Sequence, residues 1–231
     1  MGKILALACV VAVLAYAPVS GDGQTFPSVP PVMMRNSAKV RCAHGQGSGT
    51  FIGPREVLTA LHVIQSENDE GVKQFEAMIE VEIRRIVRGL PVTMWLPCTV
   101  KRHDANYDLA ILEVDTDLPS RAPVAASMPE PGAAVFIVGC PVGANVTPSL
   151  GFLATAGGLG PDSAPWLAET SANSFLGNSG GGVWNANTGE LIGVLVQFRG
   201  ARTAFGGFMA APNGSLFVPI AHVRTLMAGK P

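Results

Sequence analysis

Charged residues are scarce in this chain of 231 residues. They make up 14 % of the sequence, against roughly 25 % in an average soluble domain, and 16 Lys+Arg against 17 Asp+Glu leave a net charge of −1. A disordered chain needs high charge and low hydrophobicity, so the 48 % of hydrophobic residues excludes that class. Without an excess of Lys and Arg to attract phosphates, no nucleic-acid partner is expected.

Long apolar runs and cysteines are scarce as well. Beyond the N-terminus, no apolar run reaches the ~20 residues that a membrane-spanning helix needs. The 4 cysteines include no Cys-x-x-Cys pair and no Cys/His spacing typical of a metal site, so the cysteines predict no metal site. The chain is instead rich in turn formers, 27 Gly and 18 Pro, which predict many short strands.

The N-terminus has the pattern of a secretory signal peptide. A basic start at residues 1–3 is followed by an uncharged apolar stretch over 4–17 and by small or turn-forming residues. We predict a signal peptide over 1–21, a secreted or periplasmic protein and no stable membrane span after cleavage; an uncleaved anchor is the alternative. Residues 22–35 are Pro-rich without periodicity and predict a tether.

Short apolar runs alternate with turn residues from about residue 36 onward. About six runs fall in each half, and the halves are separated by a Pro-, Ala- and Ser-rich linker over 119–132. This pattern predicts an all-β fold of two six-stranded antiparallel β-barrels, over about 36–118 and 133–219. Apolar spacing predicts a short C-terminal helix over 220–228.

One segment of the first half is ambiguous. Apolar residues between 72 and 83 have helical spacing, whereas residues 79–83 alternate with charged residues as in a strand. We therefore expect a short helix or a loop after Gln65, followed by a strand from about Met78.

Three motifs carry possible chemistry. Ser179 lies in the Gly-rich segment GNSGGG, His62 ends the apolar segment LTALH, and Asp108 directly precedes the apolar segment LAIL. Alone, each also fits a structural role as a turn, a packed core His or a capping Asp. Together they provide a hydroxyl nucleophile, a base to remove its proton and a carboxylate to orient that base. Asp104 is a weaker candidate for the acid, because the apolar strand begins directly after Asp108.

On these motifs the chain resembles the trypsin-like (chymotrypsin-fold) serine proteases, closest to the bacterial Deg/HtrA-type branch, from about Val40 to Leu226. The segments GSGTFI, VGCPVG, ELIGV and FVPI also resemble strands and turns of that branch. The resemblance implies a protease domain over 36–231, protein or peptide substrates, and hydrolysis through an acyl-enzyme without a metal or a cofactor. His62 would act as general base and then acid, Asp108 as orienting group and Ser179 as nucleophile.

The resemblance also implies how substrate is held. Backbone N–H groups of Gly177 and Ser179, with Asn178 between them, would form the oxyanion hole. The specificity pocket is expected at Asn173, Leu195, Val196, Gln197 and Phe198. No charged side chain stands at these five positions, so a small or medium apolar substrate residue is expected.

The sequence departs from the family in two ways. Asn178 stands where digestive relatives have an Asp that pairs with a newly cut N-terminus, so activation by that ion pair is not expected. Deg-type proteins usually continue into a PDZ domain, which we do not expect here because the sequence ends soon after the segment FVPI. A catalytically inactive binding module on the protease fold and a narrow-specificity processing protease are the alternatives.

The remaining cysteines and histidines have no expected role in catalysis. Without Cys9 of the predicted signal, Cys42, Cys98 and Cys140 remain, and either Cys42 and Cys98 form a disulfide or all three are free. We expect structural or surface roles for three further histidines, His44, His103 and His222.

Overall fold

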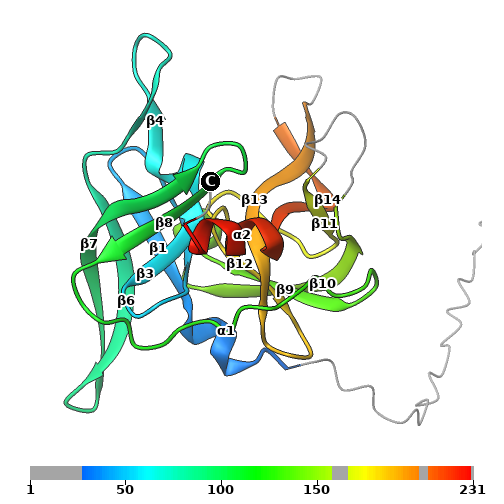
Figure 1. Ribbon diagram of the computed structural model, residues 1–231, viewed down its shortest axis with the longest axis horizontal. Helices are drawn as coiled ribbons and strands as arrows, with labels where there is room; N and C mark the ends of the chain where they lie inside the picture. Colours follow the sequence, from blue (N-terminus) through cyan, green and yellow to red (C-terminus); the bar gives the residue numbers. More distant parts are fainter. Residues whose placement is uncertain (1–27, 158–165, 203–207, 230–231) are drawn as a thin grey trace, which may run out of the picture.

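Two closed six-stranded β-barrels lie side by side (Figure 1). The computed structural model describes residues 28–157, 166–202 and 208–229. Strand order is the same in both barrels: the first three strands are neighbours, the third is followed by the sixth, fifth and fourth, and the fourth closes onto the first. All these pairings are antiparallel, and the predicted all-β double barrel is confirmed.

The elements have the following bounds. Barrel one contains β1 (Ser37–Cys42), β2 (Gln46–Phe51), β3 (Glu56–Ala60), β6 (Ile79–Val87), β7 (Leu90–Asp104) and β8 (Leu109–Val114). Barrel two contains β9 (Ala134–Gly139), β10 (Thr147–Thr155), β11 (Ala168–Thr170), β12 (Gly182–Asn185), β13 (Leu191–Arg202) and β14 (Phe208–Pro219). Outside the barrels lie α1 (Pro31–Arg35), the 3-10 turns η1 (Leu61–Ile64) and η2 (Pro141–Gly143), the strands β4 (Gln65–Glu67) and β5 (Lys73–Phe75), and α2 (Ile220–Met227).

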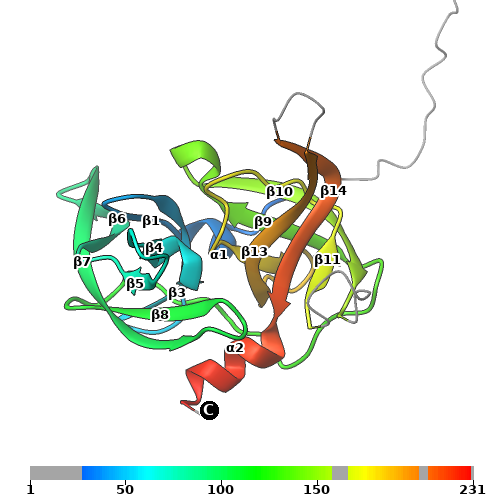
Figure 2. The ribbon, with the colours of Figure 1, turned by 90° about the horizontal axis from the view of Figure 1, so that it is seen from above.

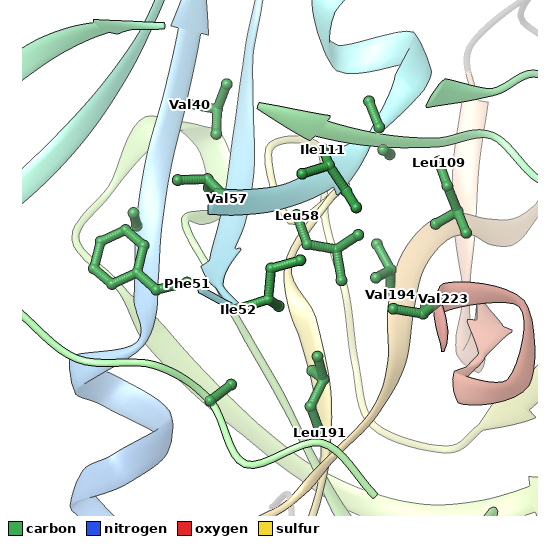
Figure 3. Packing of buried hydrophobic residues seen from close by; sticks show 14 of the residues in the cluster. Val40, Phe51, Ile52, Val57, Leu58, Leu109, Ile111, Leu191, Val194 and Val223 are labelled. Atoms are coloured by element: carbon green, nitrogen blue, oxygen red, sulfur yellow. The ribbon is translucent and has the colours of Figure 1, made fainter. Parts of the chain in front are cut away.

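One hydrophobic core extends through barrel one into the contact with barrel two and α2. Leu109 of β8, Val194 of β13 and Val223 of α2 lie close together at this contact (Figure 3). Residues 109–112 are fully buried because β8 pairs with strands on both sides and α2 packs on it. Each such buried aliphatic side chain stabilises the fold by about 1.5–3 kcal/mol.

Helix α2 joins the two barrels. It begins directly after Pro219 and buries Ile220, Val223 and Leu226, which are spaced to share one helix face. That face packs against β13 of barrel two and against β7 and β8 of barrel one, at the seam seen in Figure 2. The predicted C-terminal helix is therefore confirmed.

The tether prediction is wrong in its last part. Pro31 begins α1 at a position where a helix needs no N–H donor, and Met33 is fully buried in the core. The domain therefore begins before residue 36. The predicted signal peptide over 1–21 lies outside the described residues, and among those described no helix is long and apolar enough to cross a membrane.

The segment from Gln65 forms a β-hairpin, where a short helix or a loop was expected. Strands β4 and β5 pair around a turn in which the Asn68 side-chain oxygen accepts hydrogen bonds from the N–H groups of Glu70 and Val72. Side-chain capping of this kind favours a tight turn over a helix. Strand β6 then begins at Ile79, close to the predicted start at Met78.

The disulfide alternative for Cys42 and Cys98 is wrong. Both residues pair with Ile79 of β6, from opposite sides, so a whole strand separates them. Two strand spacings amount to about 10 Å, beyond the reach of a disulfide. Cys42, Cys98 and Cys140 are all free.

Candidate active site

His62 is presented by a turn rather than by a strand. Strand β3 ends at Ala60, and the 3-10 turn η1, which contains His62, follows directly. The turn buries its other three residues and leaves the His62 side chain 43 % exposed. The tight turn thereby anchors the backbone on the core while its imidazole faces the surface.

Asp108 holds His62 through two hydrogen bonds. One carboxylate oxygen lies 2.5 Å from His62 Nδ1, and the other accepts the His62 backbone N–H at 2.8 Å. The Asp108 carbonyl also accepts the Leu61 N–H at 3.0 Å. These contacts fix the imidazole plane and place the Nδ1 proton toward the carboxylate, which leaves Nε2 as the basic nitrogen.

Asp104 has a different function from Asp108. Its carboxylate accepts the N–H of Asn106 in the turn before Asp108. Asp108 has a φ of 55°, a left-handed conformation that Asp tolerates better than most residues. Its side chain is 30 % exposed, so it is less buried than its place before an apolar strand suggests.

Ser179 lies in a loop that is held by backbone contacts to both barrels. Its carbonyl accepts the N–H of Ser48 on β2 at 2.8 Å, and the next residue, Gly180, donates to the carbonyl of Leu195 on β13 at 2.7 Å. Gly180 has a φ of 82°, and a Cβ there would lie 2.2 Å from the Ser48 carbonyl oxygen. Only glycine fits at this position, because the backbone of the loop packs directly against barrel one.

The N–H groups around Ser179 alternate between bonded and open. Asn178 N–H donates to the Phe175 carbonyl at 3.0 Å. Neither Gly177 N–H nor Ser179 N–H has an acceptor among the described residues. Gly177 has a φ of 93°, and a Cβ there would lie 2.5 Å from the Cys140 carbonyl oxygen, so only glycine fits. Two open donors therefore flank one bonded donor.

Ser179 and His62 line the same cavity, which has a volume of about 230 Å³. Gly177 lines it too, together with residues of the β1–β2 turn and of the hairpin segment. No hydrogen bond joins the side chains of Ser179 and His62 in the described structure, as is common for catalytic pairs without substrate. The structure thus brings His62, Asp108 and Ser179 to one place.

The expected specificity residues lie apart from this cavity. Leu195 and Val196 are buried, whereas Asn173 and Gln197 are exposed and Phe198 is half-buried. None of these five is among the described residues that line the cavity shared by His62 and Ser179.

Two residues of this cavity were not singled out as functional by their sequence pattern. The Glu76 carboxylate is 4 % exposed and lies 3.0 Å from His44 Nδ1. His44 itself is 75 % exposed, which agrees with the expected surface role. No local motif marks this pair, because the turn and the hairpin that supply the two side chains meet only in the fold.

The cavity also contains a thiol, that of Cys42. Burial raises the pKa of Cys42, and the nearby Glu76 carboxylate acts in the same direction. A raised pKa keeps the thiol neutral and poorly nucleophilic. The hydroxyl of Ser179 is therefore the better candidate nucleophile in this cavity.

Comparison with known proteins agrees with this geometry. Residues 47–194 match the trypsin-like peptidase domain. The chain belongs to the trypsin-like peptidase family. This is a family of serine endopeptidases, and the match includes His62, Asp108 and Ser179.

Two curated relatives are similar over most of this chain. The serine protease homologue HhoA of Synechocystis sp. is 30 % identical over 195 residues, which cover 80 % of this chain and 43 % of HhoA. The human peroxisomal leader peptide-processing protease is 26 % identical over 173 residues, which cover 72 % of this chain and 28 % of that protein. The chain thus spans less than half the length of both relatives.

Solved structures share the fold. An HtrA-type protease, AlgW, with a bound tripeptide has a TM-score of 0.68 at 20 % identity, covering 86 % of this chain and 61 % of that one. A serine endoprotease from Yersinia pestis has a TM-score of 0.65 at 22 % identity, covering 86 % of this chain and 64 % of that one. The fold of this chain is thus similar to that of an HtrA-type protease.

Proposed function

We propose that the protein is a serine endopeptidase that acts through an acyl-enzyme. The observation that carries this proposal is that His62, held by two hydrogen bonds to Asp108, lines one cavity with Ser179. A carboxylate-bound imidazole is the base that a serine hydroxyl needs to become a nucleophile.

The chemistry follows from the positions of the groups. His62 Nε2 takes the Ser179 proton while the hydroxyl oxygen attacks the scissile carbonyl carbon. The negative charge that develops on the carbonyl oxygen is stabilised by the open N–H groups of Gly177 and Ser179. His62 then gives the proton to the leaving amine, and later removes a proton from the water that hydrolyses the acyl-enzyme.

One edge of β13 supports an extended peptide as the substrate. Pairing between β12 and β13 ends at Val194, whereas β13 continues to pair with β14 at Gln197. At Val196 and Gln197, β13 therefore has a described strand on one side only. A peptide can add to such an edge through backbone hydrogen bonds. We place the side-chain pocket there, at Asn173 and residues 195–198, with a preference for small or medium apolar residues.

The site also defines the test. A fluorophosphonate probe phosphonylates an activated serine, so purified wild-type protein should be labelled and Ser179→Ala should not. Ser120→Ala is the matched control, because the Ser120 hydroxyl only donates to the Arg35 carbonyl on the surface. Folded wild-type protein that resists labelling would overturn the proposal and favour an inactive binding module.

Labelled protein can then be tested for substrate range. Digestion of a peptide library by wild type, with Ser179→Ala as background, should give cleavage after small or medium apolar residues. Cleavage of a single sequence would favour a narrow processing protease. Cleavage mainly after Lys or Arg would contradict the proposed pocket.

We also propose that the protease is exported, because residues 1–21 have the pattern of a signal peptide. Expression of the full chain in a bacterial host, followed by fractionation and N-terminal sequencing, tests this. A mature N-terminus near residue 21 in the exported fraction is expected. An intact Met1 on soluble cytosolic protein would contradict export.

A further inference from the structure

The peptide group between Leu176 and Gly177 is held by a loop of barrel two. The Leu176 carbonyl accepts the N–H of Val142 in η2 at 2.6 Å. In a planar trans peptide the C=O and the following N–H point in opposite directions, so this bond also sets the direction of the Gly177 N–H. Ser48 Oγ donates to the Gly177 carbonyl at 2.7 Å, but that fixes only the next peptide group.

The loop that donates this bond has an unfavourable conformation of its own. Val142 has φ 45° and ψ 33°, which a β-branched residue adopts only when its surroundings impose it. Within the loop, Gly143 N–H donates to the Cys140 carbonyl and Ala144 N–H to the Pro141 carbonyl. The Val142 side chain is 71 % exposed, so side-chain burial does not account for its position.

A side chain of barrel one holds this loop. Lys39 of β1 donates from Nζ to the Gly143 carbonyl at 2.7 Å, across the contact between the barrels. The Lys39 side chain is only 16 % exposed and lies 3.8 Å from the Glu82 carboxylate. Glu82 also accepts Arg84, which reaches Asn145 at 3.3 Å. Lys39 and Arg84 are both charged donors, but the Lys39 hydrogen bond is the shorter and its side chain is less exposed than that of Arg84, so Lys39 is the main anchor.

We propose that Lys39 is a positioning residue that keeps the Gly177 N–H directed at the oxyanion. The inference rests on the proposed protease function and assigns barrel one a third contribution, beside His62 and Asp108. Lys39 holds the Gly143 carbonyl, the loop then presents the Val142 N–H, and that N–H holds the Leu176 carbonyl. Without Lys39 the strained loop relaxes and no longer holds the Leu176 carbonyl. The peptide group between Leu176 and Gly177 can then rotate, so that the Leu176 carbonyl points into the site in place of the Gly177 N–H.

Lys39→Met tests this, because Met keeps most of the buried stem and removes the donor. Lys39→Arg restores a charged donor, and Lys101→Met is the matched control, since Lys101 pairs with Glu113 and Glu56 elsewhere on barrel one. Two probes need no knowledge of the substrate: the rate of fluorophosphonate labelling and the acylation burst with p-nitrophenyl acetate. Ser179→Ala supplies the background.

Lys39→Met should slow both reactions by about 10- to 100-fold, below the 10²–10³ that complete loss of one oxyanion donor costs. The fraction of molecules labelled at completion should stay at the wild-type value, because the change affects how often the donor is in place. General misfolding would lower that fraction instead. Lys39→Arg should recover most of the rate, and Lys101→Met should match wild type.

The outcomes separate the two proposals. If wild type and Lys39→Met are labelled at the same rate, the positioning role of Lys39 is overturned, whereas the proposed protease function still stands. Wild type that fails to label overturns the protease function and this inference with it. If Lys39→Met does not fold, Lys39→Gln, which is too short to reach Gly143, takes its place with the same expected loss of rate. A lower labelled fraction at an unchanged rate would also overturn the inference.

Discussion

The two barrels have the same strand order, yet they supply different kinds of group to the site. Barrel one supplies titratable side chains, His62 and Asp108, and all but one of the ion pairs in the described residues join residues of that half. Barrel two supplies backbone: the N–H groups of Gly177 and Ser179, which have no acceptor among the described residues, and the edge of β13 at Val196 and Gln197.

The difference shows what each half depends on. Side-chain chemistry depends on charge and on the orientation of an imidazole. Backbone chemistry depends on room, since Gly177 and Gly180 lie where any Cβ would overlap a neighbouring carbonyl oxygen. Substitutions that remove a charge should therefore impair the side-chain groups from barrel one. Substitutions that enlarge a side chain should impair the backbone groups from barrel two.

The largest expected effect is on barrel one. Asp108→Asn should lower the acylation rate by about 10⁴, because an amide facing His62 Nδ1 favours the wrong tautomer. Folding should change little, since Asn keeps an oxygen to accept the His62 N–H. Burst kinetics with p-nitrophenyl acetate measure the rate. Asp104→Asn is the control and should match wild type, whereas equal losses in both variants would show that Asp108 does not orient the base.

The pairing of His62 with Asp108 could be predicted from the motifs, because each residue lies next to one end of an apolar strand that is visible in the sequence. The supporting contacts could not be predicted. Lys39 and Ser48 look like ordinary polar strand residues, and their partners, Gly143 and Gly177, lie more than one hundred residues away. Nothing local in the sequence indicates which loop of barrel two a barrel-one side chain will meet.

The errors have local causes. The β4–β5 hairpin was hidden by apolar residues with helical spacing, although Asn68 gave a turn signal. Helix α1 was hidden by the surrounding prolines, although Pro31 is well suited to a first helical position. The Cys42–Cys98 alternative failed because membership of one barrel does not make two strands neighbours.

The second effect is on barrel two. Gly180→Ala should destabilise the fold by about 3–5 kcal/mol, because a Cβ there meets both the Ser48 carbonyl and the Thr59 hydroxyl oxygen. Gly71→Ala is the matched control: its φ is 76° but no atom lies within 4 Å. That variant should lose only the ~1–2 kcal/mol of the left-handed conformation. Urea unfolding measures both, and equal losses would show that close approach is unimportant.

A smaller effect is expected at the seam, where Ser48 joins the barrels. Its fully buried hydroxyl donates to the Gly177 carbonyl and accepts the Cys140 N–H at 2.8 Å. Ser48→Ala should lose about 1–3 kcal/mol, because two buried groups lose their partner. Thr50→Val on the same strand is the control: the buried Thr50 hydroxyl has no hydrogen-bond partner among the described residues, so its removal should be neutral or stabilising. If the denaturant midpoints of Ser48→Ala and Thr50→Val fall equally, the bridging role of Ser48 is contradicted.

The smallest effect is expected at the outer seam, where α2 meets the loop before Asp108. The ring of His222 stacks on Tyr107 with centroids 3.9 Å apart, and Trp166 packs edge-on against the same Tyr107. Burial lowers the pKa of His222, and the nearby Asp104 opposes this only in part.

The sign of the pH dependence follows from that direction. Where the folded pKa lies below the unfolded value of about 6.5, the unfolded chain binds more protons, so stability falls as the pH drops through this window. The fall stops once His222 is protonated in the folded state as well. Urea midpoints at pH 7.5 and pH 5 should therefore differ more for wild type than for His222→Gln. His103→Gln, which removes a ring that packs edge-on against Phe75 and away from α2, should keep the wild-type difference. An unchanged difference in His222→Gln would show that the stacked ring does not couple protonation to the docking of α2.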